Sequence, residues 1–240
     1  MTSRPGGSGK VNIAKELEFQ DLGRRLATET HFNHTECVTL LKLHARLVAE
    51  VPLDRMQFRG LLFQALEISD TFILDRIFRV VDQDDNGVVK GDEFVRCLSV
   101  MMRGNLEELT SFCYDVYDVN GDRSLAREEL FMCLDGSLRP GRGILEKEEL
   151  ADGIKDIVEM AMKKLDVNRD GQITYEDFRD AIRREPLLMQ VCGRCLPPTR
   201  YSEAFLFLIT PDNKKISPIL HPESTAKSKK TKSAASHTIT

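Results

Sequence analysis

Three twelve-residue stretches carry oxygen-bearing side chains at the spacing that a calcium ion requires. The first, DQDDNGVVKGDE at 82–93, has such residues at positions 1, 3, 5 and 12, namely Asp82, Asp84, Asn86 and Glu93. Because Ca²⁺ takes about six to eight oxygen ligands, a loop around it needs a sharp turn at position 6 and a bidentate carboxylate at position 12. Gly87 supplies the turn, and Val88 would add its backbone carbonyl. The pattern predicts an EF-hand calcium site.

Two more loops follow in the same frame, DVNGDRSLAREE at 118–129 and DVNRDGQITYED at 166–177. Their candidate ligands are Asp118, Asn120, Asp122, Ser124 and Glu129 in one, and Asp166, Asn168, Asp170, Gln172 and Asp177 in the other. The side chain of Asp177 is shorter than the usual glutamate, which favours Mg²⁺ at the last loop more than at the others. Three such loops in register predict repeated helix–loop–helix units.

Arg123 occupies position 6 of the loop 118–129, where the other two loops have glycine. The backbone normally takes a positive φ at this position, which costs a residue with a Cβ on the order of 1 kcal/mol. Either Arg123 bears this strain, or the loop bends at Gly121 instead. We expect the strain to weaken calcium binding here relative to the loop 82–93.

A fourth, degenerate hand precedes the three loops. When the segment VPLDRMQFRG is aligned by its apolar position 8, Leu53 matches Val89, and the loop would run from Arg46 to Gln57. It has lost its oxygen ligands, but Leu53 and Val89 can still pair across a short ladder. Leu125 and Ile173 are the matching positions of the other two loops. We therefore predict an all-α protein of four EF-hands in two pairs.

The predicted domain boundaries follow the hands. Residues 1–12 are Gly, Ser and Lys rich and are expected to be disordered. The first pair covers 13–104, with the degenerate loop 46–57 and the intact loop 82–93, and the second pair covers 105–185. An irregular extension at 186–222 is expected to form a short helix at 187–191 in the groove of the second pair, and it carries an apolar patch at 205–209 that needs cover. The tail at 223–240 is rich in Ser and Lys and is expected to be disordered.

Composition narrows the function classes. The chain has 240 residues and a formal charge of −4, which gives no argument for nucleic-acid or membrane binding. The opening MTSRPGGSGK has no apolar signal core, so we expect a cytoplasmic protein with its six cysteines reduced. The CxxC at Cys192 and Cys195 has no second ligand pair nearby, and the histidines form no catalytic cluster. We therefore expect that this protein is not an enzyme.

Several longer segments add a resemblance. The run MRGNLEELTSFCYDVYDVNGD resembles the segment ahead of the third hand in neuronal calcium sensors and calcineurin B relatives. ILDRIFRVVDQDDNG, RGNLEE, DGIKDIVEMAMKKLD and REPLLMQVCGRCLP are closer to the calaxin family of axonemal calcium sensors, over about residues 35 to 198. The chain after about Thr199 is unlike that family, and so is Arg123.

The resemblance implies a calcium-responsive adaptor of the ciliary or flagellar axoneme. Its partners would be the outer dynein arm heavy chain, docking complex proteins and the doublet microtubule, and it would tune dynein-driven motility to calcium. One alternative is a soluble calcineurin-B-like or neuronal-sensor-like regulator of an enzyme or channel. Another is a structural axonemal subunit with little calcium switching.

Overall fold

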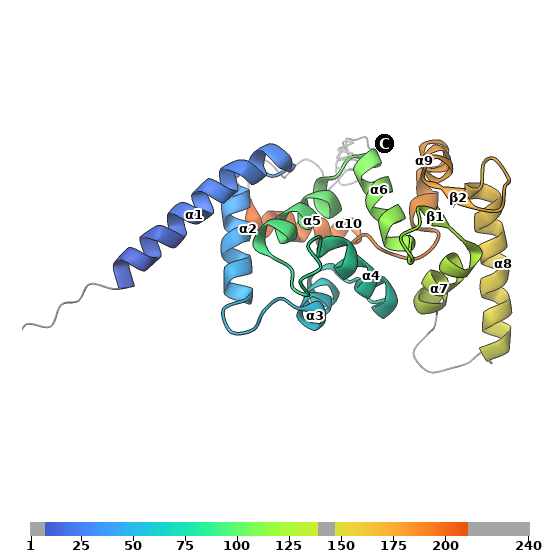
Figure 1. The fold of residues 1–240 in the computed structure, drawn as a ribbon, viewed down its shortest axis with the longest axis horizontal. Helices are drawn as coiled ribbons and strands as arrows, with labels where there is room; N and C mark the ends of the chain where they lie inside the picture. The colour runs from blue at the N-terminus through green and yellow to red at the C-terminus, as the bar shows by residue number, and fades with distance from the viewer. Residues whose placement is uncertain (1–7, 139–146, 211–240) are drawn as a thin grey trace, which may run out of the picture.

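The computed structural model describes residues 8–138 and 147–210. Its helices before the second intact loop are α1 Ser8–Glu29, α2 His34–Leu47, α3 Arg55–Leu66, α4 Thr71–Val81, α5 Gly91–Arg103 and α6 Leu106–Tyr117. After it come α7 Arg127–Leu138, α8 Lys147–Leu165, α9 Tyr175–Arg184, the 3₁₀ helix η1 Pro186–Gln190 and α10 Thr199–Ile209. The two short strands are β1 Ser124–Leu125 and β2 Ile173–Thr174. The predicted all-α EF-hand fold is confirmed (Figure 1).

The helices begin where local capping groups favour them. Asn33 accepts a hydrogen bond from the Glu36 backbone while the Glu36 side chain accepts one from Asn33, a capping box that starts α2. Asn105 and Glu108 form the same arrangement at the start of α6. α5 ends at Arg103, and the N–H of its C-cap residue Gly104 donates to the Val100 carbonyl. These signals are local, so they can be read from the chain alone.

Each pair of hands is joined through position 8 of its loops. In the second pair β1 and β2 are antiparallel, with Leu125 opposite Ile173 as predicted. In the first pair the Val89 N–H donates to the Leu53 carbonyl at 2.9 Å, which confirms the predicted pairing of these residues. The two ladders fix the loops of each pair side by side.

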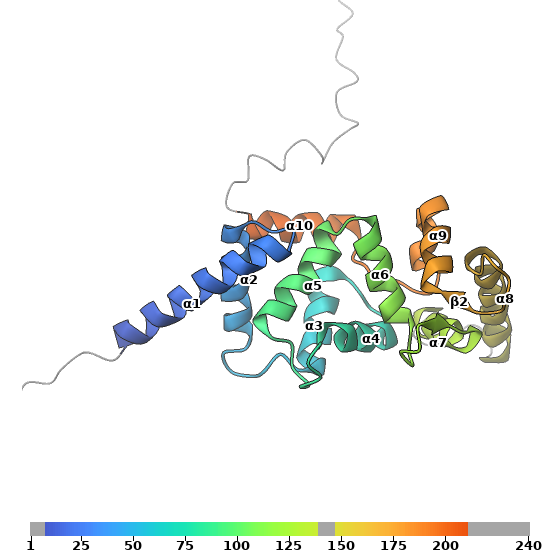
Figure 2. The same ribbon diagram turned by 45° about the horizontal axis from the view of Figure 1, so that its top comes forward.

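The elements form two lobes, the N-terminal lobe from α1 to α5 and the C-terminal lobe from α6 to α9. α4 of the N-terminal lobe packs against α6 and α7 of the C-terminal lobe, so the lobes share an interface (Figures 1 and 2). The six cysteines are buried free thiols, and the sulfur atoms of Cys113 and Cys195 lie 3.1 Å apart. In the described ranges, no helix is long and apolar enough to cross a membrane.

The expectation of disorder at 1–12 is wrong for residues 8–12, because α1 begins at Ser8. Residues 1–7 lie outside the described ranges. Farther along α1, Leu26 is fully buried, and Phe19 and Leu22 pack against the core beside it. The sequence of α1 is only weakly amphipathic and does not predict this helix. α1 lies along α2, so tertiary packing stabilises it.

The extension after residue 185 is less irregular than predicted: the short helix expected near 187–191 is present as η1, but the helix α10 was not expected. η1 packs against α9 and α6, where the Tyr117 hydroxyl donates to the carbonyl of Gly193 at 2.6 Å. α10 crosses back over the N-terminal lobe and packs against α2, α3 and α5 (Figure 2). These helices, far away in sequence, cover only part of the apolar patch at 205–209: Ile209 is buried and Phe205 and Leu206 are partly buried, but Phe207 and Leu208 remain exposed. Residues 211–222 and the predicted tail at 223–240 lie outside the described ranges.

Candidate calcium-binding sites

The loop 82–93 brings three carboxylates to one point. One oxygen each of Asp82, Asp84 and Glu93 lie within 4.8 Å of one another. In the part of the chain that the structure describes, no other group of three or more acidic, His or Cys side chains is gathered this tightly. Asp82 and Glu93 are buried, and Asp84 is exposed. A cluster of negative oxygens at this spacing fits a hard divalent cation.

Backbone amides hold these carboxylates in place. Asp82 accepts from the N–H groups of Asn86 and Gly87 at 3.1 and 2.8 Å. Glu93 accepts from Gln83 at 3.1 Å and from Lys90 at 2.8 Å, so its side chain spans the loop from its exit to its entry. The loop is thus closed around its acidic groups by the same atoms that would surround an ion.

A cationic side chain already contacts this cluster. The Lys90 ammonium, at position 9, forms an ion pair with Asp84. The hydrogen bond from Lys90 lowers the pKa of the Asp84 carboxyl and raises the pKa of the lysine. The contact shows that the site attracts positive charge, and it makes Lys90 a competitor for a bound metal.

The loop 118–129 has a similar frame. Asp118 accepts from Gly121 at 2.7 Å and from Arg123 at 3.0 Å. Glu129 reaches back to the amides of Val119 and Asn120 at 2.9 and 3.1 Å. Asp118 and Glu129 are both buried. The Asn120 amide contacts Asp122 at 2.9 Å, and the Ser124 hydroxyl donates to Gln172 of the partner loop at 3.2 Å.

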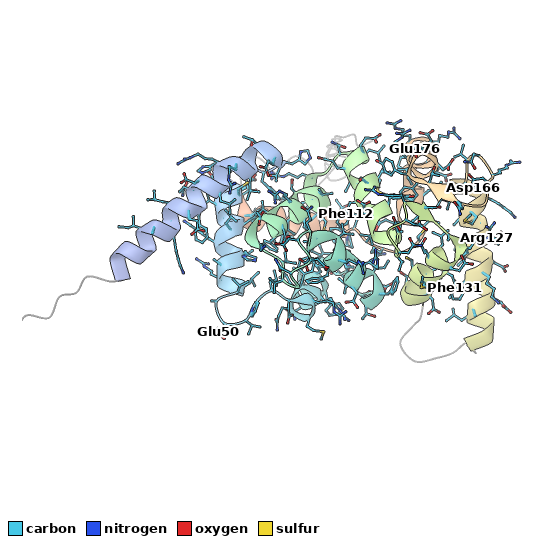
Figure 3. All side chains as sticks on the ribbon, viewed as in Figure 1. Glu50, Phe112, Arg127, Phe131, Asp166 and Glu176 are labelled. Atoms are coloured by element: carbon cyan, nitrogen blue, oxygen red, sulfur yellow. The ribbon has the colours of Figure 1, made fainter. Side chains whose placement is uncertain are left out.

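The loop 166–177 differs at its last position. Asp166, labelled in Figure 3 at the end of α8, accepts from Arg169 at 2.7 Å and Gly171 at 2.9 Å. Asp177 contacts Thr174 and the Asn168 amide. In contrast, Glu93 and Glu129 reach backbone amides at the start of their loops. The shorter side chain of Asp177 therefore closes the loop less fully.

The Asn168 side-chain amide donates to Asp170 at 3.0 Å, and the Gln172 backbone N–H donates to Asp170 at 2.9 Å. Arg127 of α7 supports this loop from outside, because its guanidinium donates to the Gly171 carbonyl at 3.2 Å and pairs with Glu159 at 2.9 Å. All the side chains predicted to face this ion thus lie on one short loop. The position 7 carbonyls of Val88, Ser124 and Gln172 remain predicted ligands.

Positive φ angles are shared between positions 4 and 6 of each loop. They occur at Asp85 and Gly87, at Gly121 and Arg123, and at Arg169 and Gly171. Arg123, at φ 67°, therefore does take the unfavourable conformation, but Gly121 takes the neighbouring one. Each loop has one glycine and one residue with a Cβ at these positions. Backbone strain alone does not single out 118–129 as the weak loop.

The degenerate hand has lost its site while keeping its structural role. Its Asp54 caps α3 by accepting from the Gln57 N–H at 2.9 Å. Position 12 is Gln57, and position 1 is Arg46 in the last turn of α2. The hand therefore offers no carboxylate at either end of its loop, and it serves to pair with the loop 82–93.

The relatives of this chain agree with that geometry. A family model described as an EF-hand domain pair matches residues 107–183. Calaxin of Danio rerio is 38% identical over 197 residues, which cover 78% of this chain and 91% of that protein. Calaxin of Homo sapiens is 38% identical over 182 residues, which cover 73% of this chain and 85% of that protein.

The chain belongs to the calaxin family. A more distant relative is calcineurin B of Schizosaccharomyces pombe, 28% identical over 167 residues, which cover 68% of this chain and 87% of that protein. This member of the calaxin family is thus a calcium-binding EF-hand sensor with a relation to calcineurin B. Which of the fifteen predicted ligand positions hold the metal stays a prediction.

Two residues that bear on the calaxin-family sites escaped sequence reasoning. Lys90 lies inside the first intact loop, so its position 9 is readable once the loop is numbered. Arg76 interrupts the apolar face of α4, and only the structure shows that it reaches the next loop. A charge on a buried helix face is the signal that could have found it.

Proposed function

We propose that this protein is a calcium sensor of the ciliary or flagellar axoneme. In this proposal it associates with the outer dynein arm heavy chain, docking complex proteins and the doublet microtubule, and it modulates dynein-driven motility when calcium rises. It acts as a regulator and not as an enzyme. The observation that carries the proposal is the calaxin-family similarity over most of the chain, joined to the carboxylate cluster of Asp82, Asp84 and Glu93.

The first test concerns the metal. Glu93→Gln removes one of the three clustered carboxylates and replaces one of the two oxygens that join the ends of the loop by an NH2 group. Titration calorimetry should show one calcium site fewer than in the parent, because a neutral amide cannot complete the shell as a bidentate ligand. The same number of sites in both proteins would refute calcium binding at 82–93.

The second test concerns location. In a ciliated cell, the tagged protein should remain with the axoneme after detergent extraction and should leave it when the outer dynein arms are absent. Full release by detergent would refute the axonemal proposal. It would favour a soluble calcineurin-B-like regulator, the alternative that the relation to calcineurin B supports.

A third measurement separates a sensor from a structural subunit. Calcium should increase the fluorescence of an apolar dye such as ANS, because sensor hands expose apolar surface when they open. Magnesium should do so much less. Axonemal retention with no calcium response of the dye would favour the structural alternative.

A further inference from the structure

Arg76 is a charged side chain on the buried face of α4, with 8% of its surface exposed. α4 leads directly into the loop 82–93, since Asp82 is its C-cap residue. At the same place ahead of their loops, α6 has Phe112 and α8 has Met160. A buried guanidinium is unfavourable unless its N–H groups are satisfied. Its partners therefore explain why it is tolerated here.

Those partners lie at the end of α6, in the other lobe. The Arg76 Nε donates to the Val116 carbonyl at 3.1 Å, and its Nη2 donates to the Asp118 carbonyl at 2.5 Å. Nη2 also lies 3.5 Å from the Asp115 carbonyl. The last turn of a helix leaves carbonyls without an intrahelical donor, and a positive charge there is favoured by the helix dipole. Arg76 thus caps α6 from a neighbouring hand.

The capped backbone belongs to a calcium loop. Asp118 is position 1 of the loop 118–129, so Arg76 holds the main chain of that loop's first candidate ligand. Burial and the neighbouring Arg79 lower the pKa of Arg76, while Cys133, Asp118 and Glu129 oppose this effect. One residue therefore joins the entering helix of one intact hand to the metal-binding end of the next, where α4 and α6 meet in Figure 1.

We infer that Arg76 is a positioning residue that couples the two intact loops, so that calcium at 82–93 changes the calcium affinity of 118–129. Calcium binding to a sensor hand changes the angle between its two helices. A shift of α4 relative to α6 moves the guanidinium and the Asp118 carbonyl that it holds. By thermodynamic linkage the coupling is reciprocal. The inference rests on calcium binding by both loops, as the proposed function does, but not on any axonemal partner.

Four proteins test the coupling: the parent, Glu93→Gln, Arg76→Met and the double variant. The calcium dissociation constant of the loop 118–129 is measured in each by NMR titration, using the amide signal of Gly121. With Arg76 present, Glu93→Gln should weaken this site by about fivefold or more, the low end of typical coupling between sites. In the Arg76→Met background, the same change should alter it by less than about twofold. The cycle cancels any direct effect of the guanidinium charge on the ion.

Arg79→Met is the matched control, because it removes an exposed arginine from the same helix and the structure gives it no bond to α6. In the Arg79→Met background, Glu93→Gln should weaken calcium binding at the loop 118–129 by the same factor as in the parent. In chelator, hydrogen exchange at the amides of Tyr117 and Asp118 should be faster in Arg76→Met than in Arg79→Met, because only Arg76 caps that turn. Arg76→Lys keeps a charge but lacks the forked donors, and it tests the same cycle if the methionine variant fails to fold.

Equal effects of Glu93→Gln with and without Arg76 would overturn the inference while leaving calcium binding intact. The inference would also be overturned if Glu93→Gln, introduced alone into the parent, left the calcium dissociation constant of the loop 118–129 unchanged. If Gly121 shows no calcium response in the parent, both the coupling and the binding prediction for that loop are refuted.

Discussion

Glu36 joins three distant parts of the chain through one buried carboxylate, with 2% of its surface exposed. Arg103, at the end of α5, donates to both of its oxygens at 2.8 Å. The Asn33 backbone N–H donates to Glu36 at 2.9 Å as part of the cap of α2, and the Thr210 hydroxyl donates at 3.0 Å from just beyond α10. These four hydrogen bonds to a single charged group tie the start of α2 to the ends of α5 and α10.

Glu36→Gln keeps the volume and removes the charge. The NH2 group that replaces one carboxylate oxygen is itself a donor and faces the donors of Arg103, Asn33 and Thr210. At least one hydrogen bond from Arg103 is therefore lost. Hydrogen bonds to charged groups contribute about 1.5–3 kcal/mol each. Because 29% of the Arg103 side chain is exposed, solvent screens part of this, and we expect a loss of about 2 kcal/mol in the free energy of unfolding. For a chain of this length that lowers Tm by roughly 4–8 °C.

The loss should depend on pH. Burial tends to raise the pKa of Glu36, but the hydrogen bonds from Arg103, Asn33 and Thr210 outweigh it, so its pKa is lowered from the usual value. A group with a lowered folded pKa contributes stability that is complete above its unfolded pKa of about 4.3 and is lost as the pH falls through the folded pKa. The difference between parent and Glu36→Gln should therefore shrink in acid.

Urea denaturation followed by circular dichroism, in chelator, measures both effects. The matched control is Glu108→Gln, because Glu108 caps α6 in the same way but its side chain is 40% exposed. The control should cost less than about 1 kcal/mol. Equal losses in the two variants, or a Glu36→Gln difference that stays constant down to acidic pH, would refute the role assigned to burial and to Arg103.

Four further substitutions test the loops. Lys90→Met should tighten calcium at 82–93 several-fold in a site-resolved titration, because it removes the cation that contacts Asp84; unchanged affinity would rule out that competition. Arg123→Gly and Arg169→Gly, at φ 67° and 64°, should each raise the free energy of unfolding by up to about 1 kcal/mol, and a loss in either would contradict the strain argument. Asp177→Glu should raise the preference of the last loop for Ca²⁺ over Mg²⁺ in competition titrations, and an unaltered preference would show that side-chain length is not the cause.

Features encoded by neighbouring residues were predictable from the sequence. The loops and the Asn33 cap depend on contacts at fixed short spacing, and the pairing of Leu125 with Ile173 follows from position 8 of two loops that the sequence itself marks. α1 was missed because packing on α2 stabilises it, and α10 because its cover lies in another lobe. The strain expected at Arg123 was incomplete, since the sequence could not show that Gly121 and Arg123 would both adopt positive φ.

Arg76 lies between these two cases. Its position on an apolar helix face is visible in the sequence, but its three carbonyl partners belong to the end of α6 and its C-cap residue, about forty residues away. The sequence predicts the clustered carboxylates of 82–93, but it does not show the contact that Lys90 makes with them. Contacts between elements, more than the elements themselves, are what the sequence left undecided.

The path of α10 also sets an order for synthesis. Thr210 meets Glu36 across 174 residues, and Arg200 pairs with Glu67 across 133. At about 5–20 residues per second, a ribosome needs roughly 10–35 seconds to make the stretch between Glu36 and Thr210. During that time the faces of α2, α3 and α5 that α10 will cover stay open to water and to chaperones. The lobe that leaves the ribosome first is the one completed last.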